Sequence, residues 1–164
     1  MFYNDNNMET KKETSAGGIV LKKIRNSKFK IRNVEWLITQ HSLNKSWGFP
    51  KGLIGDREKN EPMESAALRE VHEEGGVKAK IIHGGPVIVK FTYQWSGSPH
   101  GKTSKEKVLV HKTVYYYLME YISGDPKDHD WEMMDAKFVT ADEVKKILTY
   151  DSDKQAFEEA LKLI

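Results

Sequence analysis

The chain has 164 residues, of which 38% are hydrophobic and 30% are charged, and its formal net charge is +2. This length fits one domain with a sizeable core, and the near balance of charge gives no general attraction to nucleic acid or to a membrane surface. Because the chain has no cysteine, disulfides, thiolate metal sites and a thiol nucleophile are excluded.

The N-terminal residues 1–13 are polar and are predicted to form a mobile segment ahead of a single domain over residues 14–164. They contain no apolar run of signal-peptide length, and no later segment is apolar enough to span a bilayer. Together with the lack of cysteine, this favours a cytoplasmic protein with no membrane partner. Nothing in the sequence indicates an oligomeric state.

Runs of apolar, β-branched and aromatic residues predict five strands. They cover residues 15–24, 34–41, 86–95, 107–122 and 136–139. Between the second and third strands, residues 47–52 are expected to be extended, because Pro50 disfavours the helical region for the residue before it.

Three helices complete the prediction. The first covers about residues 62–74, since proline suits a first turn and the following pair of glycines ends a helix. Thr140 with Glu143 forms a capping box that opens a helix near 141–149. A second capping box, Ser152 with Gln155, opens a last helix that reaches the chain end. Strands around one central helix, with helices again at the end, predict an α+β domain with a mixed sheet.

The central helix carries an unusual concentration of negative charge. Glu70, Glu73 and Glu74 lie three and four positions apart, where like charges repel, and Arg69 is the one basic residue within the cluster. Carboxylate oxygens are the ligands that hard cations such as Mg²⁺ prefer. Spacing alone leaves two interpretations open, a metal site and a solvated acidic face. The apolar positions that would pack on a sheet are Met63, Ala66, Ala67 and Val71.

The segment E-P-M-E-S-A-A-L-R-E-V-H-E-E-G-G-V, residues 61–77, resembles the Nudix box, G-x5-E-x7-R-E-U-x-E-E-x-G-U, in which U is aliphatic. Eight positions match at the correct spacing: Glu61, Arg69, Glu70, Val71, Glu73, Glu74, Gly76 and Val77. The resemblance implies an α/β/α sandwich with a mixed sheet, dependence on Mg²⁺ or Mn²⁺, and hydrolysis of a nucleoside diphosphate linked to another group.

The resemblance also assigns roles to the box residues. Glu70, Glu73 and Glu74 are expected to bind the metal, and Glu70 or Glu74 to assist deprotonation of the attacking water. Arg69 is expected to orient a box carboxylate, Glu61 being the candidate. Members of the family often add an acidic ligand from the second half of the chain. Glu132 is the first choice for it, with Asp135 and Glu120 as alternatives.

The first glycine of the box has two possible registers. Counting back from Glu61 gives Gly55, whereas similarity of W-G-F-P-K-G (47–52) to the segment that precedes the box in many members gives Gly52. The second register places three extra residues in the loop before Glu61, and surface loops tolerate insertions. Gly52 is therefore preferred, and a main-chain carbonyl at Lys51 or Gly52 is the expected metal ligand.

Several residues could bind the rest of the substrate. Lys51 is placed to contact a phosphate, and Tyr115 or Tyr117 could stack on a purine, although core packing is the commoner meaning of such a run. The lysines of the loop 96–107 could meet a long polyphosphate chain or simply be solvated; they are Lys102, Lys105 and Lys107.

The sequence thus predicts a Nudix hydrolase whose substrate is a small phosphoanhydride, with a dinucleoside polyphosphate such as diadenosine tetra- to hexaphosphate in first place. W-G-F-P-K-G is similar to the same segment in hydrolases of diphosphoinositol polyphosphates and in messenger-RNA decapping enzymes. A diphosphoinositol polyphosphate and an RNA 5′ end are therefore alternative substrates. The alternative from another class is a Nudix-like binding module without catalysis, against which the full set of box carboxylates argues.

Overall fold

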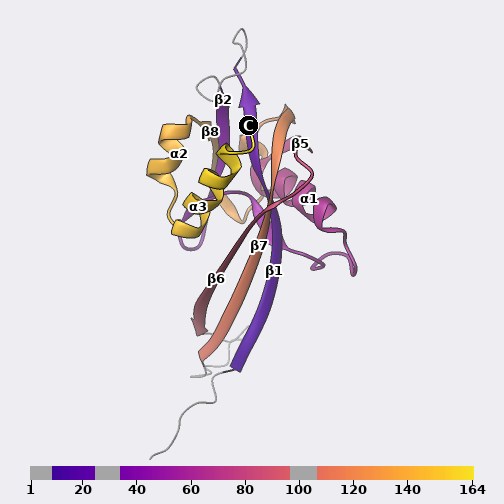
Figure 1. The fold of residues 1–164 in the computed structure, drawn as a ribbon, viewed down its shortest axis with the longest axis vertical. Helices are drawn as coiled ribbons and strands as arrows, with labels where there is room; N and C mark the ends of the chain where they lie inside the picture. The colour runs from indigo at the N-terminus through magenta and orange to yellow at the C-terminus, as the bar shows by residue number, and fades with distance from the viewer. Residues whose placement is uncertain (1–8, 25–33, 97–106) are drawn as a thin grey trace, which may run out of the picture.

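A computed structural model describes residues 9–24, 34–96 and 107–164 of the protein. These residues form a mixed sheet with helices on both faces (Figure 1). The strands are β1 (Glu9–Lys23), β2 (Val34–His41), β3 (Trp47–Gly48), β4 (Lys51–Leu53), β5 (Val77–Ile81), β6 (Val87–Ser96), β7 (Lys107–Gly124) and β8 (Met133–Val139). The helices are α1 (Met63–Gly75), α2 (Ala141–Ile147) and α3 (Asp151–Leu161), with one 3-10 turn at Pro126–Asp128.

The centre of the sheet is the pair of long strands β1 and β7, which run parallel to each other. On its other edge β1 pairs antiparallel with β4 and then with β2, and β2 in turn pairs with β3 and β8. The other edge of β7 pairs antiparallel with β6 and β5. The sheet is therefore mixed, as predicted.

Two hydrophobic clusters lie on opposite faces of the sheet. One face packs against α1 through Ala66, Ala67 and Val71. The other face packs against α3, whose Phe157 contacts Trp36 edge to face with ring centroids 5.0 Å apart. This arrangement confirms the predicted α/β/α sandwich. In the described part of the chain, no helix is long and apolar enough to cross a membrane.

Helix α1 begins and ends close to the predicted residues. Pro62 is its N-cap, and Gly76 ends it in the left-handed conformation at φ 70°, which glycine adopts without steric cost. The side of α1 that faces the sheet buries Glu70 and Glu74 as well as its alanines. Two acidic side chains are therefore held in a place where burial alone would disfavour their charge.

The structure corrects three sequence predictions on secondary structure. Strand β1 begins at Glu9, so residues 9–13 are not a mobile segment: their backbone is held by parallel pairing with β7, which a polar sequence does not reveal. Residues 1–8 lie outside the described residues. Strand β5 was not predicted, because V-K-A-K-I is short and two of its five residues are lysine.

The third correction concerns the start of α3. Its N-cap is Tyr150, with no side-chain cap hydrogen bond, so the predicted Ser152–Gln155 capping box is wrong. The Thr140–Glu143 capping box is confirmed, with both of its reciprocal hydrogen bonds present.

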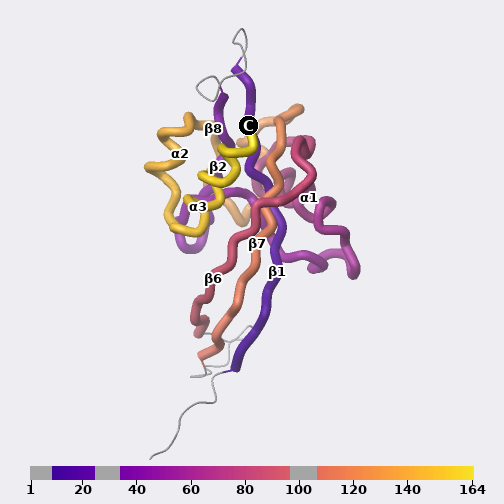
Figure 2. The backbone as a smooth tube through the Cα atoms, in the orientation of Figure 1, coloured from indigo at the N-terminus to yellow at the C-terminus, as the bar shows by residue number. Residues whose placement is uncertain are grey.

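Strands β1, β7 and β6 continue past the helices as a three-stranded ribbon (Figure 2). Pairing between β6 and β7 reaches Ser96 and Lys107, and pairing between β1 and β7 reaches Glu9 and Val108. The body of the sandwich thus carries a long β extension at one end.

Candidate active site

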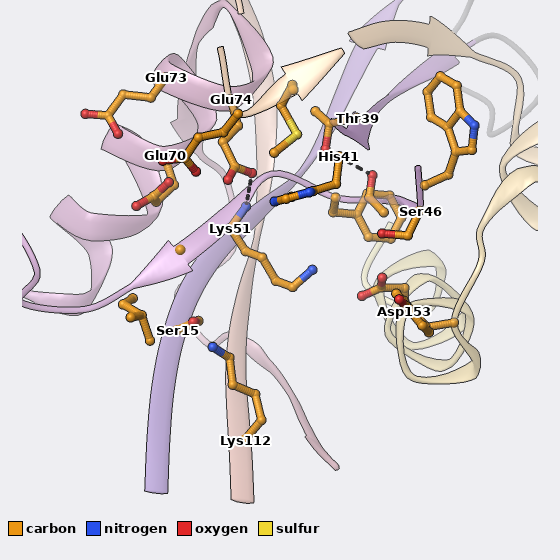
Figure 3. Close-up of a pocket in the computed structure, with 18 of the residues that line it drawn as sticks. Ser15, Thr39, His41, Ser46, Lys51, Glu70, Glu73, Glu74, Lys112 and Asp153 are labelled. Atoms are coloured by element: carbon orange, nitrogen blue, oxygen red, sulfur yellow. Dashed lines mark hydrogen bonds between the residues drawn. The ribbon is translucent and has the colours of Figure 1, made fainter. Parts of the chain in front are cut away.

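A pocket opens where α1, the segment from β3 to β4, β1 and the start of α3 meet (Figure 3). Box carboxylates of α1 form one wall, and Lys51 projects across the pocket from β4. Asp153 of α3 forms the opposite wall, and Ser15 of β1 and Lys112 of β7 line the pocket below Lys51 in this view. The pocket therefore combines acidic and basic side chains from four separate elements, α1, β4, α3 and β7.

Glu70 is a buried carboxylate of this wall. Burial raises its pKa to about 7, although the neighbouring Arg69 opposes the shift. The Arg69 guanidinium donates a hydrogen bond to Glu70 Oε1 over 2.9 Å. The carboxylate lies directly against Gly52, where any Cβ atom would collide with it. Glycine at position 52 is thus required by the approach of Glu70.

Glu74 lies deeper in the same wall. Burial raises its pKa to about 8, and the charges of Glu70 and Glu132 add to the shift. The backbone N–H of Lys51 donates to Glu74 Oε2 over 3.0 Å and acts in the opposite direction. Among the described ion pairs, none neutralises Glu74. The charge of Lys51 lowers its pKa from a distance, but less strongly than burial raises it.

Arg69 organises the rest of the acidic cluster. Its guanidinium donates to both carboxylate oxygens of Glu61, at 2.8 and 3.0 Å, and also to Glu73 and Asp56 at 3.2 and 3.1 Å. Such a bidentate pair fixes the planes of both groups. Glu73 receives a second cation, Arg57, at 3.4 Å. Arg69 thus holds carboxylates in place, in the manner that the orienting role requires.

A divalent cation fits this donor set in part. Within the residues that the structure describes, no three acidic or histidine side chains converge as a complete cation site would require. Glu70 and Glu74 nevertheless offer oxygen ligands for a hard cation. Burial raises the pKa of both carboxyl groups, and a bound cation would favour their ionised forms. Glu73 would join them only by leaving Arg57. Glu132 lines the same pocket and is available as a further ligand.

The two glycine registers differ clearly in space. Gly52 contacts the carboxylate of Glu70, whereas Gly55 lies in the following turn at φ 81° and donates its N–H to Glu61 over 3.4 Å. The main chain beside Gly52 therefore borders the acidic wall. The contact favours the Gly52 register; which carbonyl binds a metal stays a prediction.

Of the residues predicted to contact substrate, Lys51 lies in the pocket, with its ammonium 6.0 Å from the ring centre of Tyr116. Tyr115 and Tyr117 do not. Tyr117 is 4% exposed and both rings pack in the cluster beneath α1. The expected stacking role of Tyr115 and Tyr117 is therefore wrong, because alternate residues of β7 point to opposite faces of the sheet and these two face α1.

Other predicted residues also lie apart from the pocket. Glu120 pairs with Lys23 and Lys80, and Asp135 does not line the pocket. Lys102 and Lys105 lie outside the described residues, and Lys107 begins β7 at the far end of the ribbon.

Sequence reasoning missed several pocket residues. Asp153 is 3% exposed and accepts a hydrogen bond from the Tyr116 hydroxyl over 2.7 Å. Lys112 and Ser15 reach the pocket from adjacent strands. Trp47 and Tyr150 supply aromatic surface there. A charged residue within the long apolar run of β7 was the one available signal, and it pointed to Lys112.

The site and fold agree with known proteins. Residues 25–160 match the family model of the NUDIX domain. The chain is 31% identical over 159 residues to the mutator protein MutT4 of Mycobacterium tuberculosis, covering 96% of this chain and 58% of that protein. The chain thus spans little more than half the length of that relative.

Solved structures with the same fold include a MutT protein from Methanosarcina mazei Go1, with a TM-score of 0.61 and 18% identity over 95% of this chain and 97% of that one. An Ap4A hydrolase from C. elegans has a TM-score of 0.55 and 21% identity, covering 92% and 96% of the two chains. The match over most of the chain, together with the box carboxylates gathered in one pocket, shows that this chain belongs to the Nudix family, as the segment 61–77 predicted.

Proposed function

We propose that this protein hydrolyses a phosphoanhydride bond in the pocket bounded by Glu70 and Glu74, using bound Mg²⁺ or Mn²⁺. Such an ion would neutralise phosphate oxygens and lower the pKa of the attacking water. Glu70 and Glu74, with Glu73 and Glu132, are the proposed ligands. The single observation that carries the proposal is the placement of two buried carboxylates, with pKa values near 7 and 8, opposite Lys51 in one pocket.

The side chains divide the work as follows. A carboxylate whose pKa lies near neutrality can accept a proton from water at physiological pH, and Glu70 or Glu74 serves as this base. Arg69 contacts Glu61, Glu70 and Glu73 and is a positioning residue. Lys51, whose backbone N–H bonds to Glu74, extends its ammonium into the pocket and offers it to the phosphate chain.

The proposed substrate is a dinucleoside polyphosphate. Its phosphate chain would lie between the carboxylate wall and two lysines, Lys51 and Lys112, which line the same pocket. Trp47 and Tyr150 offer aromatic surface for a base in place of the two tyrosines beneath α1. The fold shared with the C. elegans Ap4A hydrolase adds support.

The test is a chromatographic screen of products with Mg²⁺ and with Mn²⁺. It compares diadenosine polyphosphates, nucleoside triphosphates, a diphosphoinositol polyphosphate and a 5′-triphosphorylated RNA. The highest kcat/KM is expected for the diadenosine compounds. A higher value for the inositol compound or for RNA would refute the proposed substrate, and no turnover of any of them would favour a binding module.

A further inference from the structure

Two residues that line the pocket belong to a face of the β1–β7–β6 ribbon that extends beyond the pocket. Ser15 and Lys112 line the pocket. In the register of the sheet, Ser15 lies beside Val114, and Lys112 lies two positions further toward the ribbon end. Phe91 of β6 is directly opposite Lys112, and opposed residues point to the same face. The face that carries the pocket therefore passes from Lys112 to Phe91.

Three aromatic side chains follow one another on this face. Phe91, Tyr93 and Trp95 occupy alternate positions of β6, opposite Lys112, Val110 and Val108. The first two rings lie 6.2 Å apart, with 34° between their planes. Tyr93 is 37% exposed and Trp95 is 43% exposed. The face thus carries a row of three aromatic side chains, of which Tyr93 and Trp95 are exposed.

Polar contacts tie this aromatic surface to the pocket. The Tyr93 hydroxyl donates to Glu13 over 3.2 Å, and the Lys112 ammonium donates to the same carboxylate over 3.1 Å. Tyr93 is therefore connected, through Glu13, to a lysine that lines the pocket. These three side chains come from β6, β1 and β7, and their hydrogen bonds link the three strands on this face next to the pocket.

The separation along the ribbon suits a substrate with two ends. Tyr93 pairs with Val110 of β7, and Ser15 pairs with Val114 of the same strand. These two β7 residues are four positions apart, which is roughly 14 Å at the rise of a strand. We propose that this aromatic face is the binding subsite for the distal base of a dinucleoside polyphosphate, with Lys112 beside the intervening phosphates. The inference rests on the proposed function, because it needs a substrate that carries a second base.

The charge of the face favours a single base over a strand of RNA. A single-stranded RNA would bring one phosphate with every base and would need cations along the whole face. Beyond Lys112, the face carries the aromatic rings and valines described above, and the ammonium of Lys11 already pairs with Glu13 at 3.4 Å. An uncharged purine matches this surface, whereas a chain of phosphates does not.

Diadenosine tetraphosphate and adenosine 5′-tetraphosphate form a matched substrate pair, because they differ only in the distal adenosine. We would measure kcat/KM for both with wild type, Trp95→Ala, Tyr93→Ala and a control, Gln94→Ala. Gln94 is exposed on the opposite face of the same strand. The two aromatic variants should lose roughly tenfold or more on the diadenosine compound, the size of effect that a stacked base produces. They should lose little on adenosine tetraphosphate, and Gln94→Ala should match wild type on both.

Trp95→Phe, which keeps an aromatic ring, should recover most of the lost activity, and thermal unfolding of every variant separates loss of binding from loss of fold. Equal losses on both substrates, or an effect of Gln94→Ala as large as that of Trp95→Ala, would overturn the subsite. A selective loss on 5′-triphosphorylated RNA would overturn it in favour of RNA.

If wild type hydrolyses neither adenosine compound but does hydrolyse another phosphoanhydride, the proposed substrate fails and this subsite fails with it. If wild type hydrolyses both and the variants do not discriminate, the subsite alone fails.

Discussion

The backbone N–H of Lys51 and the side chain of Glu74 are joined by a hydrogen bond of 3.0 Å. The bond connects the segment that leads into the box with the last turn of the box helix, across the floor of the pocket. It stabilises the ionised form of Glu74, although burial acts more strongly in the other direction. The carboxylate is consequently held in position while burial keeps its pKa raised, and several of the following predictions depend on this state.

Stability without metal should depend on the protonation of Glu74. Its folded pKa is raised from 4.5 to about 8, so between these values the folded state binds more protons than the unfolded state. The contribution of Glu74 to the free energy of unfolding should be fully present below pH 4.5 and fall by up to about 1.4 kcal/mol per pH unit as pH rises to 8. Glu74→Gln should flatten this fall, as measured by urea unfolding in chelator. Parallel curves for both proteins would contradict the assignment.

The same variant should be nearly inactive. Glu74→Gln keeps the shape of the side chain and removes a charge needed to hold a cation or to accept a proton, so kcat should fall roughly 10²–10⁴-fold. Glu73→Gln should also lower kcat strongly. Glu120→Gln is a suitable control, because that carboxylate pairs with lysines away from the pocket. Turnover close to wild type in both box variants, with normal circular dichroism, would rule out their roles.

Divalent cations should raise thermal stability as well as support activity. Binding to the folded state alone stabilises a protein by mass action, and the ligands must be ionised to bind. The rise in melting temperature on adding Mg²⁺ should therefore be larger at pH 8 than at pH 5. Activity should vanish in excess chelator and return with Mg²⁺ or Mn²⁺. Undiminished turnover after exhaustive chelation would exclude a metal-dependent reaction.

The two glycines should respond differently to alanine. In Gly52→Ala the new methyl group meets the Glu70 carboxylate, so metal affinity and kcat should both fall. In Gly55→Ala the methyl group makes an ordinary contact with the Glu58 carbonyl at 3.7 Å, but the positive φ strains the backbone, which costs about 1–2 kcal/mol of stability. Activity per folded molecule should then remain near wild type. Calorimetric metal titration and urea unfolding of both variants check this, and the reverse pattern would restore the Gly55 register.

Alanine substitution should have different effects at a tyrosine of the core and at a tyrosine of the pocket. Tyr117→Ala should destabilise the protein by about 3–5 kcal/mol, as large core truncations do, because this ring is buried beneath α1. Tyr150→Ala should change stability little and raise KM for substrates that carry a base. Unfolding curves and steady-state kinetics distinguish the two, and an unchanged KM in Tyr150→Ala would remove that ring from the substrate site.

Much of the fold and the acidic wall could be predicted because the signals are local. Pro62 and the glycine pair bound α1, and the spacing of Glu70 and Glu74 placed both on one side of it. The segment around Gly52 followed from a motif. These features depend on residues close in sequence, where periodicity and capping act directly.

What the sequence did not predict depends on pairing between distant strands. The position of Glu13 beside Lys112 follows from parallel register between β1 and β7, and no local pattern encodes register. Asp153 lies at helical spacing on the buried stripe of Ala156, Phe157 and Ala160. It was missed because its hydrogen-bond partner, Tyr116, comes from a distant strand. The stacking role of Tyr117 failed for a related reason, since alternation along a strand does not say which face will meet a helix.

The parallel pairing of β1 with β7 also has a consequence for how the protein is made. It joins residues about a hundred positions apart, from Glu9 beside Val108 to Leu21 beside Glu120. Closing so long a loop costs entropy before any contact repays it, and folds dominated by distant contacts form slowly. During synthesis the box helix leaves the ribosome well before β7, which is the parallel pairing partner of β1. The helix that carries Glu70 and Glu74 should therefore remain incompletely packed until the second half of the chain has emerged.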